Sequence, residues 1–99
     1  MSDNRYAIRR ALVLALYRFY CPQDLNTLMC DDAVICLDAD PERLKHEFSE
    51  LTLAGYLCEV PGYPEYRSLS PALRQKLDRG GSLMTDPFFA GPAALGARK

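Results

Sequence analysis

The stretch that ends at Pro22 restricts the fold most, because its apolar side chains recur at helical spacing on two faces. One face holds Ile8, Leu12, Ala15, Leu16 and Phe19, and the second holds Val13, Leu14, Tyr17 and Tyr20. Ser2 or Asp3 can cap the start of this helix, and Pro22 ends it. A helix that is apolar on two sides is buried on both. It is therefore expected to be the central helix of the domain or part of a dimer interface.

Two more helices are expected before the middle of the chain. Pro22 suits the first position of a short helix over residues 23–30, with Leu25, Leu28 and Met29 turned inward. The apolar run over residues 33–37 fits either a buried strand or the tail of that helix. Asp38 or Asp40 is expected to cap the next helix, with Pro41 in its first turn.

The helix after Pro41 has a clear inner face. Leu44, Phe48 and Leu51 share this face, and Gly55 ends the helix where a left-handed residue is favoured. The other faces are expected to carry the polar residues Arg43, Lys45, His46, Glu47 and Glu50.

A hairpin and a fourth helix follow. Residues 56–60 alternate as a strand does, residues 61–64 have turn chemistry, and residues 65–69 form the return strand. Ser70 and Pro71 are expected to start a helix over residues 72–79, and Gly80-Gly81 stops it. Residues 82–99, rich in Gly, Pro and Ala, predict an arm rather than a helix. Its expected anchors are Leu83, Met84, Phe88 and Phe89.

Two motifs in this order resemble the winged helix-turn-helix family. Leu44, Phe48 and Leu51, followed by Ala54-Gly55-Tyr56-Leu57, look like a recognition helix that runs into the wing. The run from Tyr66 to Pro71 resembles the exit from the wing, although Leu73 stands near the family's usual glycine and the return strand has one extra residue, Arg67 or Ser68.

The resemblance implies an α+β, mainly α fold. Its parts would be a three-helix core, a two-stranded β-hairpin wing, and a C-terminal helix and arm. The winged-helix domain would span residues 1–81 and the arm residues 82–99.

Because the family mostly binds DNA, the resemblance also implies a small regulator that reads double-stranded DNA. The recognition helix would enter the major groove, where Arg43 is the best candidate for a contact to a base edge. The full set of DNA-binding candidates is Arg43, Lys45, His46, Ser49 and Arg67. Arg5, Arg9 and Arg10 could add phosphate contacts if the first helix runs near the DNA backbone.

The charge distribution favours a different class of partner. Residues 21–50 hold eight acidic side chains against Arg43 and Lys45, a net charge of −6 in a chain of net charge −1. Carboxylates near phosphates repel them, and the wing turn carries no Lys or Arg. The alternative is a winged helix that binds a basic protein surface. Its candidate residues are Asp31, Asp32, Tyr63, Tyr66, Phe88 and Phe89.

Other functions find little support in the sequence. His46 is the lone histidine, no glycine-rich phosphate loop is present, and the four cysteines lack metal-site spacing, so no enzyme, cofactor or metal is expected. The cysteines are expected to be reduced and mostly buried in a cytoplasmic protein. The longest apolar run is too short to span a membrane. A homodimer through the first helix and the arm is the expected assembly.

Overall fold

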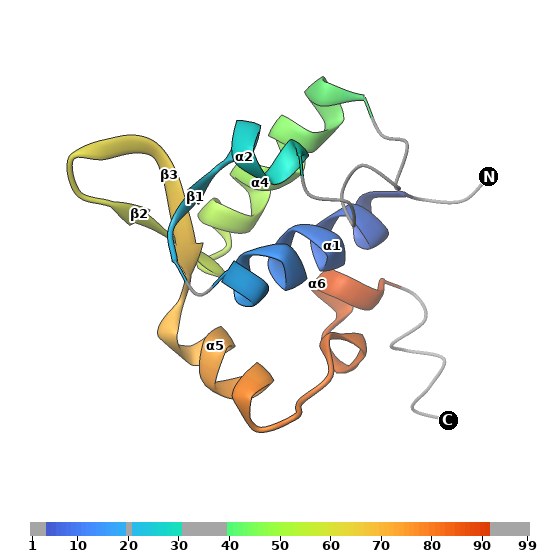
Figure 1. The fold of residues 1–99 in the computed structure, drawn as a ribbon. Coiled ribbons are helices and arrows are strands. Elements are labelled where there is room, and N and C mark those ends of the chain that lie inside the picture. The colour runs from blue at the N-terminus through green and yellow to red at the C-terminus, as the bar shows by residue number, and fades with distance from the viewer. Residues whose placement is uncertain (1–3, 20, 31–39, 92–99) are drawn as a thin grey trace.

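Helix α1 (Asn4–Phe19) lies between helix α4 (Pro41–Leu53) and the short helix α6 (Pro87–Ala90) (Figure 1). The computed structural model describes residues 4–19, 21–30 and 40–91. Buried side chains on both sides of α1 are Ile8, Leu12, Val13, Ala15 and Leu16. The central position of α1 accounts for these side chains, but Leu14 and Phe19, expected on its apolar faces, are 48 % and 38 % exposed, and the dimer interface stays a prediction.

A small antiparallel sheet stands beside the helices. It consists of β1 (Gln23–Asp24), β2 (Leu57–Val60) and β3 (Tyr63–Leu69), in the order β1-β3-β2. The β2–β3 hairpin projects from one side of the molecule (Figure 1). The chain is thus an α+β protein that is mainly helical, as expected, but its sheet has one strand more than the predicted hairpin.

Strand β1 corrects the prediction of a helix over residues 23–30. Helix α2 (Leu25–Met29) begins two residues later, because the Asp24 carboxylate accepts a hydrogen bond from the Thr27 N–H at 2.8 Å and caps it. Gln23 and Asp24 are therefore left in an extended conformation and pair with Arg67 and Tyr66 of β3.

Helix α4 follows the predicted pattern with one exception. Asp40 is the cap, its carboxylate accepting a hydrogen bond from the Arg43 N–H at 2.9 Å, and Asp38 lies outside the described residues, as does the apolar run over 33–37. The expected inner residues Leu44, Phe48 and Leu51 are buried. Glu47, predicted on a solvent-facing side, is only 2 % exposed, because it pairs with an arginine of α1.

The hairpin is tighter at its turn than predicted. Pro61 and Gly62 form the turn, with Gly62 at φ +86°, and β3 begins at Tyr63 rather than at Glu65. Val60 lies opposite Tyr63, but its neighbour Glu59 lies opposite Arg67. Between these two pairs β3 therefore holds three residues more than β2. Such a bulge bends the strand and redirects its side chains.

The described part of the predicted arm, residues 82–91, packs on the core and corrects the prediction of an arm without helix, while residues 92–99 lie outside the described residues. After helix α5 (Pro71–Asp78), whose N-terminus Ser70 caps as predicted, the chain forms a 3₁₀ turn, η1 (Leu83–Thr85), and then α6. Leu83 and Phe89 are buried in the same apolar cluster as α1 and α4. Of the four expected anchors, Met84 does not anchor the segment, since its side chain is 44 % exposed.

Candidate interaction surface

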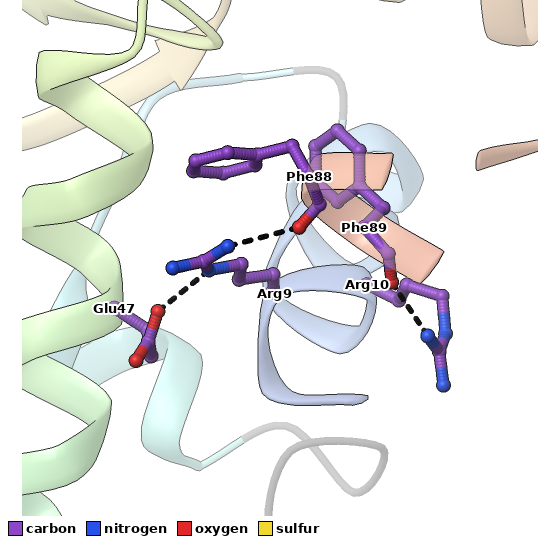
Figure 2. A network of polar contacts seen from close by, with 5 residues as sticks. All are labelled: Arg9, Arg10, Glu47, Phe88 and Phe89. Carbon is purple, nitrogen blue, oxygen red and sulfur yellow. Dashed lines mark hydrogen bonds and ion pairs between the residues drawn. The ribbon is translucent and has the colours of Figure 1, made fainter. Parts of the chain in front are cut away.

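Arg9 of α1 is the centre of a buried polar cluster (Figure 2). Its Nε donates to Glu47 Oε1 of α4 at 2.7 Å, and its Nη1 donates to the carbonyl oxygen of Phe88 in α6 at 3.0 Å. The guanidinium also lies 4.0 Å from the centre of the Phe88 ring. One side chain thus joins three helices through an ion pair, a hydrogen bond and a cation–π contact.

Arg10 and Tyr56 hold the two ends of α6. Arg10 Nη1 donates to the carbonyl oxygen of Phe89 at 2.6 Å, near the C-terminus of α6, where a cation is favoured (Figure 2). At the other end, the Tyr56 hydroxyl donates to Asp86 Oδ2 at 2.6 Å, and Asp86 Oδ1 accepts from the Phe88 N–H. Burial and the Asp86 carboxylate raise the pKa of Tyr56 to about 12.

These contacts remove Arg9 and Arg10 from the set of candidate phosphate ligands. Arg9 is buried, and Arg10 is half-buried with its guanidinium on the α6 carbonyl. The expectation that they add phosphate contacts is therefore wrong. The signal that could have identified a structural role is the pairing of Arg9 with Glu47, but the two residues lie 38 positions apart in the chain.

The DNA-binding candidates on α4 are all exposed. Arg43, Lys45, His46 and Ser49 lie on the solvent side of one helix, as the sequence predicts. Lys45 Nζ lies 3.7 Å from Glu42 Oε2, and both side chains are exposed, so this pair contributes little to stability. Because the negative charge of Glu42 offsets the positive charge of Lys45, the net charge of this helical face is low.

Arg67, the fifth DNA-binding candidate, is turned inward. Its Nη1 donates to the carbonyl oxygens of Pro64 and Tyr66 at 2.6 and 2.8 Å, and its Nε donates to Thr52 Oγ1 of α4 at 3.2 Å. The guanidinium thereby joins the bulged part of β3 to its own carbonyls and to α4. Arg67 is the sole basic residue of the hairpin, and it is used to hold the hairpin against α4.

The tyrosines predicted for protein binding come together at the hairpin. The ring centres of Tyr63 and Tyr66 lie 5.5 Å apart at an angle of 58°, and Tyr63 is 59 % exposed. With Pro22 and Val60 they line an open cleft of about 350 Å³. Sequence reasoning missed Pro22 and Val60, because the pairing of β1 with β3 that brings Pro22 to the hairpin is a long-range contact.

The other protein-binding candidates do not join this surface. Phe89 is fully buried at 0 % exposure, and Phe88 is half-buried between Arg9 and Tyr56, so the prediction that they form an exposed interface is wrong. Both rings instead complete the core where α6 meets α1. Asp31 and Asp32 lie outside the described residues.

The exposed charge on the hairpin is acidic. Glu59 and Glu65 are exposed, whereas Arg67 is half-buried and hydrogen-bonded to the chain itself. Asp24 pairs in register with Tyr66, and hydrogen bonds from the Thr27 side chain and backbone hold the pKa of Asp24 below its usual value. The exposed charge of the hairpin is therefore negative, and Asp24 is the carboxylate that shares a face of the sheet with Tyr66.

The cysteines only partly follow the prediction. Cys21 and Cys30 are exposed free thiols and Cys58 is a half-buried one, so the expectation of mostly buried cysteines is wrong, while Cys36 lies outside the described residues. Within residues 4–19, 21–30 and 40–91, no group of three or more His, Cys, Asp or Glu side chains is placed to hold a metal ion. None of the helices in this part of the chain has the length and apolar character needed to cross a bilayer.

No family model, curated protein or solved structure matches this chain. Function therefore has to be inferred from the contacts and charges described above.

Proposed function

We propose that the chain is a winged-helix domain that binds a basic protein surface through its hairpin and the adjoining face of α4. The order of elements supports the winged-helix assignment. Helix α4 passes through Gly55, at φ +90°, into the β2–β3 hairpin, and Ser70-Pro71 leads from the hairpin into α5. These are the segments whose sequence resembles the family.

The observation that carries the choice of partner is the internal use of the arginines. Arg9 binds Glu47, Arg10 binds the carbonyl of Phe89, and Arg67 binds the carbonyls of the hairpin. Nucleic-acid affinity depends mainly on Lys and Arg side chains that are free to neutralise phosphates. Three arginines that would serve this purpose in a DNA-binding protein are engaged inside the fold.

The charge of the proposed surface supports the same choice. From Asp40 to Leu69 the chain has six acidic and three basic side chains, a net charge of −3. The buried pair with Arg9 neutralises Glu47, which leaves −2 on this part of the molecule. A surface of this sign repels phosphates and attracts a basic partner.

DNA binding by α4 is the second candidate, and one observation favours it. Arg43, Lys45, His46 and Ser49 are all exposed on one helix, and each carries a group that can contact a base edge or a phosphate. In this alternative, Arg43 reads the major groove and Lys45 contacts the backbone.

A salt titration with random duplex DNA separates the two candidates. At low salt we expect no saturable binding with a Kd in the range of non-specific DNA-binding proteins, which is roughly 10⁻⁴–10⁻⁶ M. The titration compares the wild type with Arg43→Ala/Lys45→Ala. The matched control is Arg18→Ala/Arg79→Ala, which removes the same charge from exposed positions outside α4 and the hairpin. Binding that weakens steeply with salt and is lost in the α4 variant alone would replace our proposal with the DNA-binding one.

The exposed thiols bear on where the protein acts. Cys21 and Cys30 are free and exposed, a state that reducing compartments maintain. We therefore place the proposed function in the cytoplasm. Mass spectrometry of alkylated protein from native cells would test this, since a cytoplasmic protein should be labelled at both cysteines without prior reduction.

A further inference from the structure

The cleft beside the hairpin is large enough to receive a side chain of a partner. It is bounded by Pro22, Val60, Tyr63 and Tyr66 and has a volume of about 350 Å³. Ligand pockets in proteins range from roughly 300 to 1,000 Å³, so this one is at the small end. An extended side chain from a partner fits this space better than a large ligand does.

The aromatic walls of the cleft are not part of the core. Tyr63 and Tyr66 do not belong to the apolar cluster, and Tyr63 is the more exposed of the two. Successive residues of a strand point to opposite faces, so Tyr66 and Arg67 face opposite sides of β3. The chain's own guanidinium lies on the α4 side, against Thr52 and near the Phe48 ring.

The charge around the cleft selects a cationic occupant. Asp24 stands opposite Tyr66 in the sheet, so its side chain lies on the same face of the sheet as the Tyr66 ring. The face of a tyrosine ring attracts a cation placed within about 6 Å of its centre. The tyrosine rings and the Asp24 carboxylate therefore both favour a positively charged occupant.

We propose that this cleft binds an arginine side chain of a partner protein, with the guanidinium stacked on Tyr63 and Tyr66 and the Asp24 carboxylate on the same face of the sheet. Arginine suits the site better than lysine, because its planar group stacks on aromatic rings and is more weakly hydrated. A proline-rich peptide would use the rings but would gain nothing from the Asp24 carboxylate. The inference rests on the proposed protein-binding function and names the group that is recognised.

Titration of the ¹⁵N-labelled full chain by NMR tests the assignment. The probes are short blocked Gly/Ser peptides that differ only in their central residue, which is arginine, citrulline, lysine or proline. The arginine peptide should shift the amide signals of Val60, Tyr63 and Tyr66 in a saturable way. Citrulline has nearly the same shape without the charge, and its peptide should bind at least about twofold more weakly.

Two variants at one position separate the ring from simple apolar contact. Tyr63→Leu removes the aromatic face and should weaken binding of the arginine peptide about two- to fivefold, whereas Tyr63→Phe keeps the ring and should bind as the wild type does. Asp24→Asn, which keeps a side-chain oxygen to cap α2, should reduce both the affinity and its dependence on salt. Unchanged amide spectra away from the hairpin will show that each variant is folded.

Three results would overturn the inference. They are equal binding of the arginine and citrulline peptides, equal binding by Tyr63→Leu and Tyr63→Phe, and stronger binding of the proline peptide. A failure here is separate from a failure of the proposed function. If the chain binds neither duplex DNA nor the arginine peptide, only the inference is overturned. A chain that binds DNA through α4 loses the proposed function, whatever the peptides do.

Discussion

The cluster around Arg9 and the cleft at the hairpin reverse the usual placement of residue types. In the Arg9 cluster, charged groups lie in the interior and have partners from α1, α4 and α6. In the cleft, the exposed ring of Tyr63 and the half-buried ring of Tyr66 lie beside each other and line the walls together with Pro22 and Val60. The interior charges hold the fold together, and the exposed rings are available for a partner.

The difference shows that the type of a residue says less about its function than its surroundings do. Arg9, Arg67 and Arg43 are all arginines that a DNA-binding protein could use. Arg9 has acceptors on α4 and α6, and Arg67 has acceptors on α4 and in its own strand, whereas Arg43 lies on the exposed side of α4. A buried group that loses its partner is penalised by desolvation, but an exposed group is not. Mutations in the two regions should therefore have very different effects.

The largest effect is expected from breaking the buried ion pair. Arg9→Ala or Glu47→Ala leaves an unpaired charge in the core and should lower the free energy of unfolding by about 3–5 kcal/mol. Urea titration followed by circular dichroism measures this change. Lys45→Ala, which breaks the exposed pair with Glu42, is the matched control and should cost less than about 1 kcal/mol. Equal losses in the two pairs would contradict the structural role assigned to Arg9.

Replacing Gly91 should have the next largest effect. Gly91 has φ +63°, and a Cβ there would lie 2.6 Å from a ring carbon of Tyr6, so Gly91→Ala should destabilise the protein by roughly 1–3 kcal/mol. Gly62 also has a positive φ, but a Cβ there would meet no atom within 4 Å, so Gly62→Ala should lower the stability less. Thermal unfolding of both variants gives the comparison. Tyr6→Ala should partly relieve Gly91→Ala, and the lack of any relief would refute the proposed clash.

A smaller and pH-dependent effect is expected at Tyr56. Tyr56→Phe removes the hydrogen bond to Asp86 and should cost about 1–2 kcal/mol at neutral pH. The folded pKa of about 12 is above the ordinary value of 10. This stabilisation is therefore complete below pH 10 and is lost as the pH rises toward 12. Urea titrations from pH 8 to pH 12 should show the wild type converging on the variant, and a constant difference would argue against the raised pKa.

The smallest effect on stability is expected at the cleft. Tyr63→Ala removes an exposed side chain and should change the free energy of unfolding by no more than about 0.5 kcal/mol. The same variant should lose binding of the arginine peptide. A large loss of stability would mean that Tyr63 supports the hairpin itself, and the contrast between the two regions would no longer hold.

Features that depend on neighbours in the chain could be predicted from the sequence. The cap at Ser70, the cap at Asp40 as one of two options, and the helix end at Gly55 each arise from contacts within a few residues. The inner face of α4 follows from helical periodicity. The exposed positions of the α4 candidates follow from the same periodicity, and the exposed position of Tyr63 follows from its place in the predicted turn.

Features that depend on distant segments could not. Glu47 has a charged side chain on a helix with an amphipathic pattern, and nothing local indicates that Arg9 will enclose it. Phe89 lies in a segment rich in Gly and Pro, so its burial depends on α1 being present to receive it. Pro22 reaches the cleft only through the two-residue strand β1. Each of these contacts joins parts of the chain that local patterns treat separately.

The contacts between α1 and α6 also set the order in which the chain can fold during synthesis. Arg9 and Arg10 reach carbonyls that lie 79 residues further along the chain. At a translation rate of 5–20 residues per second, α1 waits roughly 4–16 s for these partners. During that time the face of α1 that packs against α6 is not yet covered by it. A ribosome-bound intermediate that ends before Pro87 should therefore be a good substrate for chaperones that bind exposed apolar helices.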